Sequence, residues 1–502
     1  MKINKLIVTG LAMLSLVSCE DYLSVNGTST VTGDKYQEIV AKNPEVLGST
    51  LAGTYLYLAS WDAGGQDAHD DINLMGTLHA TDLMTEDMVQ TISHWFTYDY
   101  THDNRMENYR RPSSIWKTFY TTISQANGVI AAIDQDAVEL PGSKLRPYYG
   151  QALALRAFSY MYLVQLFQNP FIGEPDAFGS KIDRSLPAVP MYFAKNEVGK
   201  ETDYSRNTVG DILDMIKADL DEANAMLTGF SRDSKINIDQ SVVQGLLARY
   251  YLMIGDWDNA AAAAVSARNG YPLMDKTALY SGFMTLATPE WMWGFDHNSE
   301  TNSMYASFFS HVSNLTPGYA GLNYAPRAID RRLYDNIPAT DYRKGLFNGS
   351  AKNTEQANAG AQGPYANLKF GWDGAWTMDY VYMRASEMYL IEAEALARQN
   401  KMTDAATALK PFMALRDTAW HNTTITVDEV LFQRRIELWG EGFAYFDLKR
   451  LHKGIDRTYE GTNHRTPDGL LKIAAGDVRW TYQIPLSEIQ ENSAIGKDDN
   501  NK

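Results

Sequence analysis

Only one cysteine, Cys19, occurs among the 502 residues. A single cysteine cannot form an internal disulfide bond or supply a cysteine-rich metal cluster. Long hydrophobic runs are also absent. The stretch from Leu6 to Val17 is too short for a stable membrane span, and no later stretch approaches about 18 apolar residues. These absences predict a body that does not cross a membrane.

Basic residues are few relative to acidic ones. The chain has 45 lysine and arginine residues against 61 aspartate and glutamate residues, which gives a formal net charge of −16. A surface of this sign repels nucleic acids and anionic membranes, so we expect no nucleic-acid partner. Hydrophobic residues make up 45% of the chain, which is enough to build a large core and argues against wholesale disorder.

Catalytic and cofactor-binding motifs are missing too. The sequence has no zinc-protease, nucleophile-elbow, phosphate-loop or dinucleotide-binding pattern. The nine histidines show no metal-ligand spacing, and the acidic cluster of Asp67, Asp70 and Asp71 does not match a calcium-binding loop. We therefore predict no catalytic residue, no metal and no cofactor. A pair of facing carboxylates, as glycosidases use, stays open because 61 acidic residues offer many pairs.

What is present begins with an export signal. Lys2 and Lys5 precede the short apolar run, as in a secretory signal peptide. Residues 16–19, Leu-Val-Ser-Cys, resemble the lipobox of bacterial lipoproteins. The resemblance implies a signal peptide over 1–18 and lipidation of Cys19, and a plain secretory signal with a chance cysteine is the alternative.

The residues after the cysteine bear on location. Glu20 and Asp21 resemble the signal that exports lipoproteins to the outer cell surface. Residues 19–35 are rich in serine, threonine and glycine, which is typical of a linker. We therefore expect a lipidated N-terminus and linker over 19–35, anchored in the outer membrane and facing the cell exterior.

Helical periodicity dominates much of the remaining chain. Stretch 248–261 is similar to 393–406, because in each a helix passes through a Gly or Asn turn into an alanine-rich helix, as in tetratricopeptide repeats. The pattern predicts an all-α fold of tetratricopeptide-like helix pairs with a few short strands. We expect one domain over 36–495 and a polar tail over 496–502. Apolar spacing predicts helices at 115–130, 145–167, 209–227, 242–254, 260–267, 381–398 and 403–416.

Three long segments interrupt these helices: 59–112, 286–335 and 345–380. They hold many of the aromatic residues, which make up 12% of the chain. Loops of this length in a compact protein are usually functional or disordered, and an aromatic-rich composition favours function. The sequence therefore predicts a helical scaffold that supports a loop-built binding face.

Four further motifs follow the lipobox in order along the chain. They are Leu-Arg-Ala-Phe-Ser-Tyr at 155–160, Met-Arg-Ala-Ser-Glu-Met-Tyr-Leu at 383–390, Arg-Arg-Ile-Glu-Leu-Trp-Gly-Glu-Gly-Phe at 434–443 leading to Phe-Asp-Leu-Lys-Arg at 446–450, and Tyr-Gln-Ile-Pro-Leu-Ser-Glu-Ile at 482–489. Together with the lipobox, these four motifs resemble the SusD/RagB family of outer-membrane nutrient-binding lipoproteins.

The resemblance implies a surface lipoprotein that captures a glycan, an oligosaccharide or polysaccharide. It implies delivery of that glycan to a partner SusC-like TonB-dependent transporter, without enzymatic activity. The shared motifs are interpreted as structural. Buried charges must be paired, so we expect their charged residues to form ion pairs with one another: Arg156, Arg384, Glu437, Glu441 and Arg450.

The ligand contacts are expected in the aromatic insertions. A sugar ring offers an apolar C–H face to aromatic rings and a hydroxyl rim to polar side chains. Capture of a peptide or another nutrient on the same scaffold stays open, as do a tetratricopeptide-type assembly protein and an unrecognised hydrolase. Trp257, Trp291, Trp293 and Trp439 are interpreted as packing residues. The candidate ligand-binding residues are Trp61, Trp95, Tyr98, Tyr305, Phe309 and Trp372, with Asp70, His94, Asn298 and Arg327 as polar partners.

Overall fold

The computed structural model describes residues 33–62, 64–197, 199–200, 202–353, 363–464 and 469–502. The predicted signal peptide, Cys19 and nearly all of the 19–35 linker lie outside these residues. None of the helices in the described ranges combines the length and the apolar character that crossing a bilayer requires.

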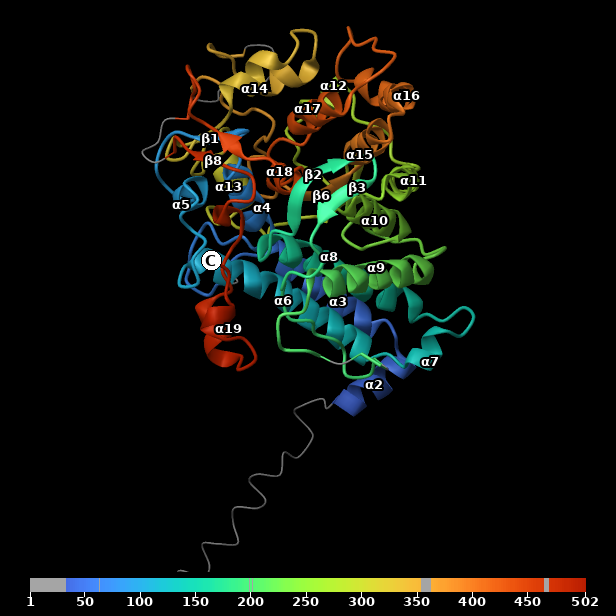
Figure 1. Cartoon of the computed structure of the whole chain (residues 1–502). Helices are drawn as coiled ribbons and strands as arrows, with labels where there is room; N and C mark the ends of the chain where they lie inside the picture. Colours follow the sequence, from blue (N-terminus) through green and yellow to red (C-terminus); the bar gives the residue numbers. More distant parts are fainter. Residues whose placement is uncertain (1–32, 63, 198, 201, 354–362, 465–468) are drawn as a thin grey trace, which may run out of the picture.

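The fold is mostly helical, as predicted (Figure 1). The strands are short and form four two-stranded antiparallel pairs in the described part of the chain. The helices are α2 (Gly33–Lys42), α3 (Val46–Ala59), α4 (Asn73–Leu83), α5 (Thr97–Tyr100), α6 (Arg110–Ala131), α7 (Gln135–Val138), α8 (Arg146–Leu166), α9 (Val209–Met226), α10 (Gln240–Ile254), α11 (Trp257–Ala267), α12 (Lys276–Leu279), α13 (Phe308–Val312), α14 (Arg331–Asn336), α15 (Ala385–Arg398), α16 (Met402–Met413), α17 (Val427–Glu437), α18 (Ala444–Arg450) and α19 (Leu486–Glu491). The strands are β1 (Met88–Gln90), β2 (Phe171–Asp176), β3 (Gly179–Ile182), β4 (Trp291–Phe295), β5 (Arg327–Ile329), β6 (Tyr380–Arg384), β7 (Ile455–Asp456) and β8 (Lys472–Ile473).

Neighbouring helices pack in a continuous series. Helix α6 lies on α8, α8 on α9, α9 on α10, α10 on α11, α11 on α15, and α15 on α16. Figure 1 shows α9, α10, α11 and α16 climbing along one side of the molecule. Six of the seven predicted helices correspond to α6, α8, α9, α10, α11 and α16. The predicted scaffold of helix pairs is therefore present.

The turn between α10 and α11 shows why these residues pair. Gly255 ends α10 in the left-handed conformation, with φ of +79°. Asp256 then caps α11, because its carboxylate accepts a hydrogen bond from the backbone N–H of Asn259. The buried alanines Ala260 and Ala264 let α11 approach its neighbours closely.

The predicted helix at 381–398 is wrong at its start. Residues 380–384 form β6, which pairs with β4, and α15 begins only at Ala385. The aromatic and β-branched residues Tyr380, Val381 and Tyr382 favour an extended chain over a helix. Strand β4 is buried on both sides, so Trp291 and Trp293 are core residues as expected; Trp257 and Trp439 are buried as well.

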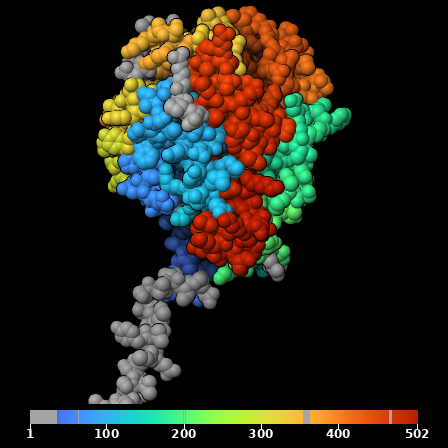
Figure 2. Space-filling view, turned by 60° about the vertical axis from the view of Figure 1, so that its left-hand side comes forward, coloured from blue at the N-terminus to red at the C-terminus, as the bar shows by residue number. Residues whose placement is uncertain are grey.

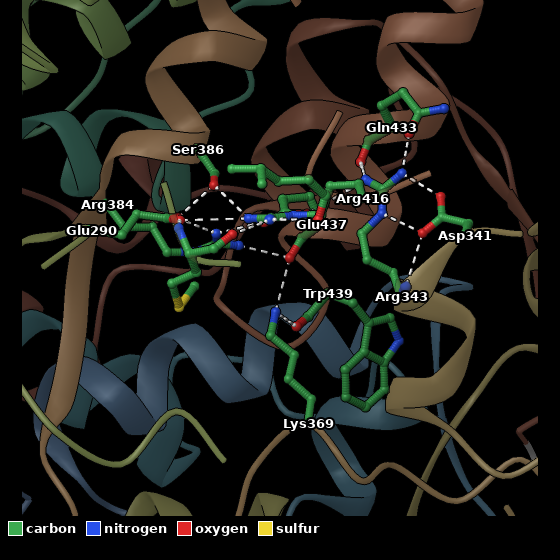
Figure 3. A network of polar contacts seen from close by, with 12 residues as sticks. Glu290, Asp341, Arg343, Lys369, Arg384, Ser386, Arg416, Gln433, Glu437 and Trp439 are labelled. Carbon is green, nitrogen blue, oxygen red and sulfur yellow. Dashed lines mark hydrogen bonds and ion pairs between the residues drawn. The ribbon is translucent and has the colours of Figure 1, made fainter. Parts of the chain in front are cut away.

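A buried ionic cluster joins β6 and α17 to the surrounding loops (Figure 3). Its four cationic and four anionic side chains balance in formal charge, and all are almost fully buried. We call it the ionic core. It consists of Arg343, Lys369, Arg384 and Arg416 with Glu290, Asp341, Glu437 and Glu441.

Arg384 and Glu437 stand at the centre of the ionic core. The Arg384 guanidinium bonds Glu437 Oε1 at 2.6 Å, Glu290 Oε1 at 2.8 Å and both oxygens of Glu441 at 2.7 Å. Burial alone would raise the pKa of Glu437, but its cationic neighbours, led by Arg416 and Arg384, hold that pKa well below its usual range. Glu437 is therefore ionised in the folded protein.

The other two motif arginines do not join the ionic core. Arg156 pairs with Glu197 and Asp219, at 2.6 and 2.7 Å. Arg450 pairs with Glu394 at 2.6 Å. The expectation of paired, structural charges is confirmed, while the expectation that all five residues couple to one another is wrong, because Arg156 and Arg450 pair with carboxylates outside that set.

We expect Glu437→Gln to lower the free energy of unfolding by about 3–5 kcal/mol, because it leaves buried arginines without their counter-charge. Urea unfolding measures this loss. Lys181→Gln is the control: it breaks the pair with Asp176, whose partners are 46% and 45% exposed, so the loss should stay below about 1 kcal/mol. Equal losses for the two variants would contradict a special role for the ionic core.

Acid should weaken the pair between Glu394 and Arg450. Burial alone would raise the pKa of Glu394, but Arg450, Arg398 and Arg434 lower it from 4.5 to about 2. Because this folded-state pKa is depressed, the stabilisation is complete above pH of about 5 and is lost as the pH falls from about 4.5 towards 2.

The free-energy difference between wild type and Glu394→Gln should therefore be constant above pH of about 5 and shrink by roughly 3 kcal/mol below it. Urea unfolding at stepped pH measures it. The exposed Glu139→Gln should follow the wild-type curve throughout. A Glu394→Gln difference that does not change with pH would contradict the assignment.

Candidate functional site

Exposed apolar side chains concentrate in two of the three aromatic-rich insertions. The described residues include seventeen large hydrophobic side chains that are exposed, and nine of them come from 59–112 and 286–335. The two segments adjoin on the face shown in Figure 2, where they are blue and yellow. The nine are Trp61, Ile92, Tyr98, Met106, Tyr109, Met304, Tyr305, Leu322 and Tyr324.

His69 lies at the centre of a cluster of rings on this side of the molecule. Its ring centroid is 5.9 Å from those of Trp61, Trp95 and Tyr319, and 6.4 Å from that of Tyr305, to which it is nearly parallel. Its Nδ1 also lies 2.7 Å from the Tyr319 hydroxyl. The two insertions are thus joined through direct ring contacts.

The cluster extends in two directions. At one end, the Tyr324 ring lies 5.6 Å from His94. At the other, the Trp376 ring lies 6.1 Å from Tyr305 and 4.7 Å from Trp372, which brings in the third insertion. We call this surface the aromatic face. It comprises Trp61, His69, His94, Trp95, Tyr305, Tyr319, Tyr324, Trp372 and Trp376.

Local hydrogen bonds hold the rings in place. Gln90 ends β1, and its side-chain amide donates to the Trp95 carbonyl at 3.2 Å and to the Thr97 hydroxyl at 2.9 Å. In the third insertion, the Asp373 carboxylate accepts backbone hydrogen bonds from three residues between Ala375 and Thr377, at 2.8–2.9 Å. These bonds fix the backbone that carries Trp95 and Trp376.

A cavity of about 480 Å³ opens beside Trp95. Arg110 lines it and pairs with Asp70 at 2.7 Å. Asp70 and Asp99 also bind the buried Arg111, each at 3.0 Å, so the charges at this wall are largely compensated. Such a cavity can take a small polar group next to the aromatic face. Its lining is Asp70, His94, Trp95, Phe96, Tyr98, Asp99, Asn104, Tyr109 and Arg110.

Two of the predicted ligand contacts are wrong. Phe309 is only 1% exposed and packs in the core under the aromatic face, and Arg327 is fully buried. The Arg327 Nε donates to His79 Nε2 at 2.9 Å, and burial lowers the pKa of Arg327 to about 9. Burial and then Arg327 lower the pKa of His311 to about 3, so this histidine is neutral. These side chains support the face and do not meet solvent.

The structure places the remaining predicted residues as follows. Asp70 is buried and holds Arg110 and Arg111 rather than facing solvent. Tyr98 is exposed at the cavity beside Trp95. Asn298 is exposed in a turn, where its side-chain oxygen accepts two backbone N–H groups. The structure brings together Trp61, His94, Trp95, Tyr305 and Trp372 in the aromatic face.

Four members of the face were not predicted: His69, Tyr319, Tyr324 and Trp376. The three aromatic ones lie in the insertions whose composition singled out the region. His69 carries no signal in the sequence, because a lone histidine in a polar turn has many ordinary roles. Within the described residues, no three His, Cys, Asp or Glu side chains are arranged to hold a metal ion.

The loss of stability on substitution by alanine should differ between the buried Phe309 and the exposed Tyr305. Phe309→Ala removes a buried ring and should cost about 3–5 kcal/mol. Tyr305→Ala removes a ring that is 42% exposed and should cost less than about 1.5 kcal/mol. Urea unfolding of both variants measures the contrast, and a larger loss for Tyr305→Ala would contradict its surface position.

Comparisons with known proteins give consistent matches. A family model described as "Starch-binding associating with outer membrane" matches residues 60–252, and one described as "SusD family" matches residues 371–500. Together the two models cover more than half of the chain. A curated relative, SusD-like protein P2 of Formosa agariphila, is 23% identical, and the match covers 96% of each chain.

Solved structures share the fold. A SusD-like carbohydrate binding protein from Bacteroides vulgatus has a TM-score of 0.73 at 24% identity, with 91% of this chain and 98% of that chain covered. A laminarin binding SusD-like protein has a TM-score of 0.62 at 18% identity, with 88% and 96% covered. The motifs, the helical fold and both family models agree, and the chain belongs to the SusD/RagB family.

Proposed function

We propose that this chain binds a glycan on the aromatic face. The observation that carries the proposal is the continuity of that face: three insertions far apart in the sequence meet in one set of contacting, partly exposed rings. A large exposed apolar patch is unusual on a soluble surface unless it binds something. Flat rings beside polar groups match the two sides of a sugar.

The energetics fit reversible capture. Each stacked ring contributes about 0.5–1.5 kcal/mol beyond the area that it buries. Two or three rings with a few hydrogen bonds can supply roughly −4 to −8 kcal/mol, which corresponds to dissociation constants of about 1 mM to 1 μM. Because the rings are already held by one another and by backbone hydrogen bonds, little ordering cost reduces this affinity.

The comparisons support the ligand class. One family model carries a starch-binding description, and a protein of the same fold is named for binding laminarin. Both starch and laminarin are polysaccharides. The chemistry of the aromatic face and the names of the relatives therefore point to the same class of ligand, without deciding which glycan this chain takes.

The proposal includes the cellular role. The lipobox at 16–19 supports a lipid anchor on Cys19 in the outer membrane, facing outwards. Figure 1 shows α5 and α13, which border the aromatic face, well away from α2 at the start of the described chain. The face is then free to capture a glycan and pass it, unhydrolysed, to a partner SusC-like TonB-dependent transporter.

Single ring deletions test the face. Trp95→Ala and Tyr305→Ala should each weaken polysaccharide binding by roughly two- to tenfold, because each removes one stacking surface. Affinity electrophoresis in gels that contain laminarin, amylopectin, xylan or galactomannan measures the change, on the chain from residue 20 onwards. Phe178→Ala is the matched control, since its ring is 96% exposed on the β2–β3 turn, outside the face.

The same samples are assayed for new reducing ends. We expect binding to one polysaccharide class without cleavage. Release of reducing ends by the wild type would contradict a purely capturing role. An equal loss of binding for Phe178→Ala would contradict the assignment of the face. An absence of binding to every polysaccharide in the panel would contradict glycan capture and favour a peptide ligand instead.

A further inference from the structure

A second hollow lies at the other end of α6. It has a volume of about 520 Å³ and is walled by the segment of residues 192–195, together with Thr202 and Tyr204. We call it the tyrosine hollow. Figure 1 shows this segment, in green, crossing the lower half of the molecule where α6 lies. Its lining includes Tyr120, Ser124, Gly128, Tyr192, Lys195 and Tyr204.

The hollow carries its own row of rings. The Trp116 and Tyr120 centroids are 4.5 Å apart, Tyr120 and Tyr192 are 5.2 Å apart, and Tyr192 and Tyr204 are 5.5 Å apart. The row runs from the buried Trp116 to Tyr204, which is 58% exposed. This arrangement repeats the chemistry of the aromatic face with different residues.

The outer wall of the hollow is held rigidly. Tyr192 is fixed on both sides of its backbone, because its N–H donates to the Tyr160 hydroxyl at 2.7 Å and its carbonyl accepts from Asn127 at 3.0 Å. Just beyond it, Glu197 receives two hydrogen bonds from Arg156, at 2.6 and 2.9 Å. The motif arginine of α8 thus anchors the segment that carries the rings.

Gly128 keeps the floor of the hollow open. It lies inside α6, where glycine costs about 1 kcal/mol relative to alanine. Apart from its chain neighbours and the backbone of its own helix, no described atom lies within 4 Å of the position where a Cβ would stand, so packing against other elements gives no reason for a glycine here. A glycine in this place permits close approach from outside the protein.

The lining favours an uncharged, hydroxyl-rich ligand. The described lining residues include no carboxylate, and their one cation, Lys195, is exposed at the rim. The nearby Glu488 lies at the inner end of the row of rings, where it accepts a hydrogen bond from the Trp116 indole at 3.3 Å. Ser124 and Thr202 add hydroxyl groups beside the rings. We propose that the tyrosine hollow is a second binding site for a neutral saccharide chain. This inference rests on the proposed binding of a glycan at the aromatic face.

The spacing of the two sites makes the second one useful. Arg110 borders the cavity beside Trp95, and Gly128 borders the tyrosine hollow. Gly128 is eighteen residues from Arg110, or roughly 27 Å along the helix axis, and Tyr120 at the near edge of the hollow is ten residues from it, or roughly 15 Å. A polysaccharide that occupies both sites gains avidity over a short oligosaccharide that reaches only one. The protein then retains long chains in preference to short ones.

Variants of the two sites are compared in gels that contain laminarin, amylopectin, xylan or galactomannan. Tyr192→Ala/Tyr204→Ala removes the rings of the hollow. Gly128→Met fills the hollow from the helix and keeps every ring. Because methionine has a higher helix propensity than glycine, this variant should stay folded even if the double tyrosine variant does not. Trp95→Ala/Tyr305→Ala disables the aromatic face, and Phe178→Ala is the surface control.

We expect both hollow variants to weaken binding of the polysaccharide by three- to tenfold. The aromatic-face variant should keep a residual retardation, which adding Gly128→Met abolishes. Wild-type binding that both hollow variants leave unchanged would overturn the inference and leave the proposed function intact. If the wild type binds no polysaccharide in the panel, the proposed function and the inference fail together.

Discussion

The ionic core is the constraint on which the aromatic face depends. Glu290 stands directly before β4, at the base of the 286–335 insertion, and Lys369 stands three residues before Trp372 in the third insertion. Lys369 donates to the carbonyls of Glu437 and Trp439 at 2.9 and 2.8 Å. The Trp439 indole in turn donates to the Asp87 carbonyl at 2.9 Å, within the first insertion. Segment 434–443 therefore contacts the first and third insertions directly, and it reaches Glu290 of the second through Arg384, which bonds both Glu290 and Glu437.

Burying eight charges is a costly way to stabilise a protein. The desolvation penalty of buried ions often cancels their attraction, so apolar residues of the same volume would serve stability as well or better. The ionic core fixes the relative positions of the segments that it joins, because guanidinium–carboxylate contacts have a specific geometry. Long insertions need such an anchor, since their rings must meet across wide gaps in the sequence.

The sequence was informative where periodicity or composition carried the signal. The alanine-rich helix pair and its Gly255 turn follow from local patterns, and so does the concentration of rings in the insertions. Burial of single side chains inside those insertions does not. Phe309 and Arg327 have neighbours of the same character as the exposed residues, so only the packed structure separates them. At 380–384 the helical spacing of the residues that follow outweighs the local preference of Tyr380, Val381 and Tyr382 for an extended chain, and the pairing with β4 that decides for a strand is a long-range contact.

Helix α6 connects the aromatic face to the tyrosine hollow. Both ring clusters lie on segments held by buried arginines: Arg111 beside the aromatic face and Arg156 behind the tyrosine hollow. Rigid, partly exposed rings lose little conformational entropy on binding, so more of the contact energy appears as binding affinity. Since α6 keeps the two clusters at a fixed separation, the length of the bound chain becomes part of what the protein recognises. A flexible connection between them could not select for length in this way.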